Sequence, residues 1–80
     1  MVDLARRAFA LGEAGTIAYN AADETAVAAF EERRIKYTDI ARVVEITLSA
    51  EWDSRVDDLD SIFYFDALAR ERASKAVVEL

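Results

Sequence analysis

The stretch that decides the fold is Asn20-Ala21-Ala22-Asp23-Glu24-Thr25-Ala26-Val27-Ala28-Ala29-Phe30. Asn20 is a favoured N-cap residue, and Asp23 follows three positions later, where a carboxylate meets the free N–H groups and the positive end of a helix dipole. An apolar strip then recurs at the i, i+4, i+7 and i+8 spacing of one helix face: Ala22, Ala26, Ala29 and Phe30. The stretch therefore predicts a helix that begins at or just after Asn20 and runs to about Arg33.

A second block, Tyr37-Thr38-Asp39-Ile40-Ala41-Arg42-Val43, follows after a short spacer. Thr38 is the candidate cap of a third helix, with Asp39 in its first turn. The run of β-branched residues in this region taken alone favours a strand, but the strict alternation of a strand is missing. The apolar positions follow a helical period instead: Ile40, Val43, Val44, Thr47 and Leu48.

Two further helices flank these blocks. The first covers Asp3 to about Leu11 or Glu13 and ends at Gly12 or Gly15, because glycine accepts a positive φ without steric cost. Residues 16–19 then form a short extended link. Residues 49–56 form a loop or a frayed end, and the last helix starts between positions 57 and 60. We expect that helix to continue unbroken through the aromatic cluster at positions 63–65, so that one of its rings stays exposed.

Four amphipathic helices with short links predict an all-α fold, an up-and-down bundle or a close variant, with residues 1–80 as a single domain. A chain of this size buries roughly 60–65% of its unfolded surface and has a stability of about 4–12 kcal/mol. If Phe30 lies in the core, its replacement by alanine costs ~3–5 kcal/mol. The predicted core is Phe9, Phe30, Val43, Val44, Leu48, Ile62, Phe65 and Val77.

The net charge of −6 argues against nucleic acid or an anionic membrane surface as a partner. No run of the ~20 apolar residues needed to cross a bilayer occurs, and no apolar stretch of a targeting signal follows the first residues. These features predict a soluble, cytoplasmic protein. The chain has no cysteine, which excludes disulfides and thiolate metal sites. It also has no histidine, so it lacks the commonest general base and the commonest neutral metal ligand.

The polar residues suggest no reaction centre. A calcium or magnesium site is conceivable at the acidic cluster of Asp57, Asp58 and Asp60, but the spacing and the central glycine of an EF-hand are missing. Carboxylates are also favoured at the N-terminus of a helix, where they interact with its dipole, and this is the interpretation we adopt. Gly12 and Gly15 are not followed by the lysine of a phosphate loop, and the serines and threonines have no histidine partner. A single tryptophan at a helix end more often covers the rim of a small core than it anchors a partner, so we expect Trp52 to lie at the rim. The sequence thus predicts no catalytic, cofactor-binding or metal-ligating residue in this chain.

The two central blocks, in this order and at this short spacing, resemble the C-terminal helical domain of 1-deoxy-D-xylulose 5-phosphate reductoisomerase. Family members usually have asparagine at the position of Asp23, a proline at that of Ile17 or Ala18, and an aliphatic residue at that of Tyr19. The similarity runs across nearly the whole chain, through Leu4-Ala5, Gly15-Thr16, Asn20-Ala21-Ala22, Glu24, Ala26-Val27, Ala29-Phe30, Ile35, Tyr37, Asp39-Ile40-Ala41, Asp66-Ala67 and Ala69-Arg70-Glu71.

This resemblance implies a parent enzyme of the non-mevalonate route to isoprenoid precursors. Such an enzyme uses NADPH and a divalent metal, magnesium or manganese, to rearrange and reduce 1-deoxy-D-xylulose 5-phosphate to 2-C-methyl-D-erythritol 4-phosphate. The family's cofactor loop, metal ligands and phosphate-binding residues belong to other domains and have no matching positions here. The resemblance therefore implies a non-catalytic domain without its own cofactor, whose partner is the catalytic domain of the same polypeptide.

Two alternatives remain open from the sequence. The chain fits a stand-alone helical interaction module that binds a partner helix in an exposed groove. It also fits a degenerate remnant used only for dimerisation. The apolar content of 54% in so small a chain predicts one apolar helix face that braces the catalytic domain and through which the isolated chain can self-associate.

Overall fold

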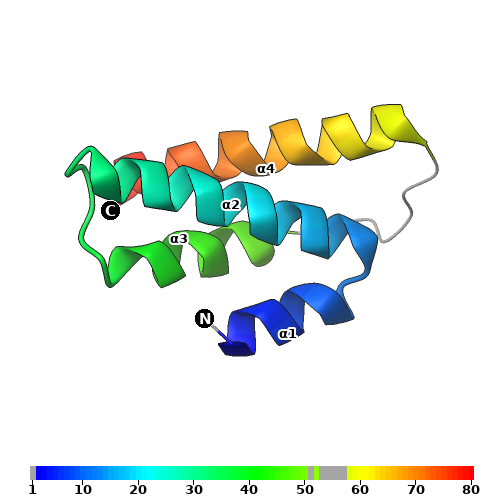
Figure 1. The fold of residues 1–80 in the computed structure, drawn as a ribbon, viewed down its shortest axis with the longest axis horizontal. Coiled ribbons are helices and arrows are strands. Elements are labelled where there is room, and N and C mark those ends of the chain that lie inside the picture. Colours follow the sequence, from blue (N-terminus) through cyan, green and yellow to red (C-terminus); the bar gives the residue numbers. More distant parts are fainter. Residues whose placement is uncertain (1, 51, 53–57) are drawn as a thin grey trace.

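The computed structural model describes residues 2–50, 52 and 58–80. These residues contain helices and no strand, which confirms the all-α fold class. Four helices follow one another along the chain (Figure 1): α1 (Val2–Ala10), α2 (Glu13–Glu31), α3 (Asp39–Leu48) and α4 (Leu59–Glu79).

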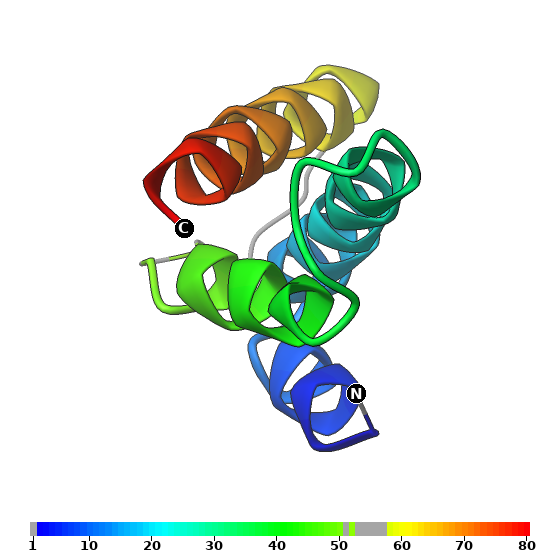
Figure 2. The same ribbon diagram turned by 90° about the vertical axis from the view of Figure 1, so that its left-hand side faces the viewer.

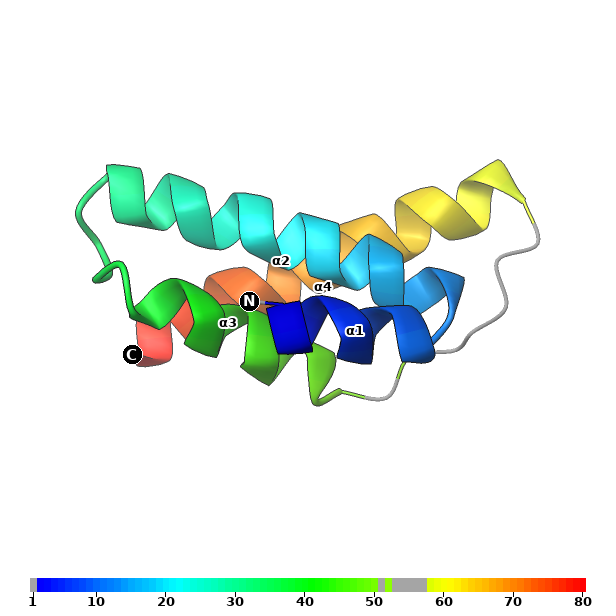
Figure 3. The same cartoon turned by 60° about the horizontal axis from the view of Figure 1, so that its bottom comes forward.

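The helices alternate in direction but do not form a closed square bundle. In Figure 1, α1 and α3 run one way while α2 and α4 run the other. Seen along the helices in Figure 2, α4 and α1 lie at opposite ends of the section, with α2 and α3 between them. Helix α2 packs against all three others, whereas α1, within the described residues, approaches only α2 and α3 (Figure 3). The architecture is therefore the close variant of an up-and-down bundle, with three helices packed together and α1 added on one side.

The core is built mainly from alanine. Among the described residues, ten of the eighteen buried hydrophobic ones are alanines, and most of these lie on α2 or on the face of α4 toward it. Small side chains let two helix backbones approach closely, and the dispersion contacts of the backbones then replace those of large side chains. The buried alanines are Ala8, Ala14, Ala18, Ala21, Ala22, Ala26, Ala29, Ala69, Ala73 and Ala76.

Helix α2 begins much earlier than the sequence predicts. Its N-cap is Gly12, whose φ of 89° belongs to the region that favours glycine, so the chain reverses there and enters α2 at Glu13. Asn20 lies exposed inside the helix, and residues 16–19 are helical and not an extended link. The prediction was wrong because the alanines before Asn20 favour helix and bury their side chains against neighbouring helices.

Gly15 lies inside α2 and does not end α1. A Cβ at this position would come closer than 3.0 Å to the carbonyl oxygen of Ala8 and the Cβ of Leu11. Glycine therefore permits the close crossing of α1 and α2, whereas Gly12 provides the predicted end of the first helix.

The buried face of helix α3 matches its prediction. All five positions of its predicted apolar period are buried: Ile40, Val43, Val44, Thr47 and Leu48. The buried Thr47 hydroxyl donates to the Val43 carbonyl at 2.9 Å, which satisfies its hydrogen bonding inside the core.

Trp52 closes the end of the core near α3. Its side chain is 9% exposed, and its indole Nε1–H donates to the Thr47 carbonyl at 2.9 Å. The ring packs edge-on against Phe65, with centroids 6.4 Å apart, and the Arg72 guanidinium lies 5.5 Å from its centroid. The tryptophan is thus a rim residue of the core, as the sequence predicts.

Helix α4 starts inside the predicted interval and continues unbroken through residues 63–65. Its N-cap is Asp58, whose Oδ1 accepts a hydrogen bond of 2.8 Å from the Ser61 backbone N–H. This bond lowers the pKa of the Asp58 carboxyl below its ordinary value of 3.8. Of the three aromatic residues, Phe65 points into the core, whereas Phe63 and Tyr64 are both exposed.

Three residues of the predicted core lie outside it. Phe9 is 81% exposed, Phe30 38% and Ile62 39%, whereas the other five predicted residues are buried. The alanine faces bring the helices so close that large side chains at the edge of a helical face lie on the surface. The cost of Phe30→Ala is therefore below the ~3–5 kcal/mol of a fully buried phenylalanine.

Among the described residues, no helix combines the length and the apolar character that crossing a membrane requires.

We predict that Gly15→Ala destabilises the protein by about 1–3 kcal/mol, because the added methyl group forces α1 and α2 apart. Chemical unfolding followed by circular dichroism measures this change. Asn20→Ala, an exposed position of the same helix, is the control and is expected to match or slightly exceed the wild type, because alanine is the better helix former. A Gly15→Ala variant as stable as the wild type would contradict the close crossing.

The pH dependence of the Tm of an Asp58→Asn variant tests whether the charge of the α4 cap stabilises the protein. A carboxyl whose pKa is lowered on folding stabilises the protein above the pKa of its unfolded state, and this contribution is lost as pH falls through the folded pKa. Asparagine can still accept the Ser61 hydrogen bond but carries no charge. The Tm of the variant should thus lie below that of the wild type at neutral pH and converge with it in acid. A Tm difference that does not change with pH would refute this role of the charge.

Candidate functional site

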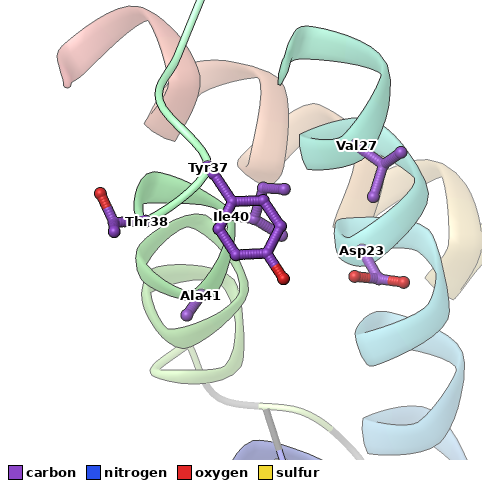
Figure 4. Close-up of a pocket in the computed structure, with 6 residues that line it drawn as sticks. All are labelled: Asp23, Val27, Tyr37, Thr38, Ile40 and Ala41. Carbon is purple, nitrogen blue, oxygen red and sulfur yellow. The ribbon is translucent and has the colours of Figure 1, made fainter. Parts of the chain in front are cut away.

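A pocket among the described residues lies between α2 and α3. Its volume is about 480 Å³, and its lining is mostly apolar. Figure 4 shows Asp23 and Val27 on α2 facing the ring of Tyr37 across the pocket, while Thr38 points away from it. The pocket and Phe30 at its rim are called the α2–α3 groove below. The lining residues of the pocket are Asp23, Val27, Tyr37, Thr38, Ile40 and Ala41.

A tight turn after α2 brings Tyr37 to this groove. The Arg33 N–H donates to the Phe30 carbonyl and the Arg34 N–H to the Ala29 carbonyl, both at 2.9 Å, which is the Schellman pattern of a helix end. Arg33 takes the left-handed φ of 62° that this motif requires. The two arginines therefore lie in the turn after α2, which ends at Glu31, two residues before the end that the sequence predicts.

The rest of the connection fixes the second wall of the groove. Ile35 folds back into the core, but Tyr37 does not, with 74% of its surface exposed. Thr38 is the N-cap residue of α3, although its side chain makes no capping bond. The Asp39 carboxylate instead accepts a hydrogen bond of 3.1 Å from the Lys36 N–H. The Tyr37 ring is thus held edge-on against Phe30, with ring centroids 5.7 Å apart.

The chemistry available in the groove is that of binding. It offers one carboxylate, from Asp23, and the hydroxyl of Tyr37, beside the apolar side chains of Val27 and Ile40. The groove is therefore suited to an apolar group with a polar or cationic neighbour.

A smaller pocket of about 220 Å³ lies between α3 and α4 and is more polar. Two cations, Arg72 and Lys75, and one carboxylate, Glu79, line it together with Ile46, Ala50 and Ala76.

The acidic residues before α4 act as helix-start residues where the structure describes them. Asp58 is the cap, and Asp60 lies in the first turn of α4. Asp57 lies outside the described residues. Within the described ranges, no three potential ligand residues gather into a group that could hold a metal ion.

Arg70 joins the two longest helices. From α4, its Nη2 contacts the Glu24 carboxylate on α2 at 2.7 Å, and its Nε contacts Asp66 one turn earlier on α4 at 2.9 Å. Both carboxylates raise the pKa of the arginine, which stays charged. Because the three side chains are partly exposed, the pairs contribute about 0.2–1 kcal/mol each at most. The Glu24 pair links α4 to α2 and joins segments that carry the resemblance described above.

Comparison with known proteins places the chain in a family. Residues 1–72 match the family described as the DXP reductoisomerase C-terminal domain. The chain is 48% identical to the 1-deoxy-D-xylulose 5-phosphate reductoisomerase of Aeromonas salmonicida over 77 residues, which are 96% of the chain and 19% of that enzyme. It is 49% identical to the reductoisomerase of Rhodospirillum centenum over 74 residues, which are 92% of the chain and 18% of that enzyme.

The reductoisomerase of Ectopseudomonas mendocina is 44% identical over 72 residues, 90% of the chain and 18% of the enzyme. No solved structure matches the chain. The chain thus spans about a fifth of the length of these relatives. A match over most of the chain, together with the helical fold, shows that the chain belongs to the DXP reductoisomerase C-terminal domain family.

Proposed function

We propose that this chain serves as the helical C-terminal domain of a 1-deoxy-D-xylulose 5-phosphate reductoisomerase and supports catalytic residues carried by other domains. The observation that carries the proposal is the match over 96% of the chain to an enzyme of that name, of which it covers only 19%. Residues 1–80 are then one domain, and its partner is the catalytic domain of the same polypeptide.

The reaction belongs to the longer polypeptide in this proposal. That enzyme converts 1-deoxy-D-xylulose 5-phosphate into 2-C-methyl-D-erythritol 4-phosphate, with NADPH as the reductant and a divalent metal, magnesium or manganese, at its active site. We assign neither cofactor to residues of this chain. Three carboxylates of the described part have structural roles: Asp58 caps α4, while Glu24 and Asp66 hold Arg70. Location in the cytoplasm stays a prediction of the sequence.

The packing of the chain supports a bracing role. The closely packed alanine faces hold α2 and α4 together, and the Arg70–Glu24 pair links the two helices at the surface. At the same time, large apolar side chains remain exposed on α2, on the turn after it and on the first turns of α4. A firm frame with uncovered apolar residues is typical of a domain that packs against another protein surface.

The stand-alone interaction module is the weaker candidate. It also explains the exposed apolar residues, but it gives no reason for a match to one enzyme name along nearly the whole chain.

Replacing the corresponding segment of the Aeromonas salmonicida enzyme by this chain tests the proposal. We predict that the chimera oxidises NADPH in the presence of 1-deoxy-D-xylulose 5-phosphate and Mg²⁺, whereas the isolated chain does not. The same enzyme carrying an unrelated four-helix bundle in this place is the control and is expected to be inactive. Turnover by the isolated chain, or an inactive chimera, would refute the proposal.

A further inference from the structure

We propose that the α2–α3 groove is the surface on which this domain docks, and that a patch of the catalytic domain covers it with an apolar side chain next to a lysine or arginine. This inference rests on the proposed function and names the contact through which the support acts.

The apolar part of the groove is partly uncovered in the chain itself. Val27 is 36% exposed, Phe30 38% and Tyr37 74%, and all three lie at one seam between α2 and α3. A pocket of about 480 Å³ beside them has room for more than one large side chain. Aromatic residues around an apolar hollow are typical of the energetically important centre of a protein interface.

The polar part of the groove determines the charge of the partner. Among the described residues, Asp23 is the only charged one that lines the pocket, and none of the ion pairs found there involves it. A carboxylate that becomes buried in an interface without a partner is strongly destabilising. The covering surface must therefore bring a cation to Asp23 beside the apolar group that fills the pocket.

The length of the relatives supports a domain of the same polypeptide as the occupant. About four fifths of the Aeromonas salmonicida enzyme lies outside the region that this chain matches. A second copy of the chain fits less well, because each copy carries a net charge of −6 and two copies repel each other.

Single cysteine reporters test the docking surface, because the chain has no cysteine of its own. Val27→Cys places a thiol at the groove, and Val78→Cys makes the same substitution at a position of α4 that is 79% exposed. Phe63→Cys reports on a second group of exposed apolar residues, on the first turns of α4, which consists of Leu59, Ile62, Phe63 and Tyr64. The rate of alkylation of each thiol is measured by mass spectrometry in the isolated chain and in the full-length chimera.

We expect the thiol at position 27 to react about tenfold or more slowly in the chimera than in the isolated chain, because it reacts only when the interface opens locally. Reactivity at positions 63 and 78 should change little. The inference would be overturned if the thiol at position 27 were alkylated at the same rate in both proteins. It would also be overturned if the thiol at position 63 were protected in the chimera as strongly as the thiol at position 27. Protection at position 27 in the isolated chain that increases with its concentration would overturn it as well, since that indicates a second copy as the occupant.

Charge reversal provides a second readout. Asp23→Lys should lower the Tm of the chimera more than that of the isolated chain, whereas the control Glu71→Lys, exposed on α4, should affect both equally. An equal effect of Asp23→Lys on both proteins would overturn the role of the cation. An active chimera with an unprotected groove would refute this inference and leave the proposed function standing, whereas an inactive chimera would refute both.

Discussion

The close approach of α2 to its neighbours is the constraint on which the rest of this structure depends. Along the buried face of α2, only alanine and glycine fit between the helix backbones: Ala14, Ala18, Ala22 and Ala26 are fully buried, and Gly15 has no room for a Cβ. Interiors packed in this way tolerate added volume poorly. The helices are therefore held in one arrangement by the sizes of their side chains, although the chain is short and has no disulfide.

This packing explains the surface of the domain as well as its core. Because the alanine faces fill the interior, Phe30 stays at the edge of α2, and the turn at Arg33 places Tyr37 against it. The groove between α2 and α3 thus arises where two closely packed helices meet a tight connection. A frame of this kind can hold one apolar surface in a fixed position, and support of a larger enzyme requires no more than that.

The sequence predicts those features that depend on local pattern. The apolar period of α3 corresponds to its buried residues, and the acidic start of α4 contains the cap at Asp58. The start of α2 was missed because Gly15 suggests a helix end, whereas its role depends on contact with Ala8. Phe9 and Phe30 were assigned to the core because hydrophobicity alone does not tell how closely two alanine faces pack. The sequence does not predict the groove, because the groove depends on how α2 and α3 are placed in space and on the left-handed conformation of Arg33 between them.

Native-state hydrogen exchange of the 80-residue chain tests the central claim most directly. If α2 is continuous and packed on both sides, the amides of Ala18, Ala22 and Ala26 exchange only through global unfolding and share one free energy of opening. Fast exchange of Ala18 beside protected amides at Ala22 and Ala26 would show that the helix begins near Asn20, and would contradict the packing described here.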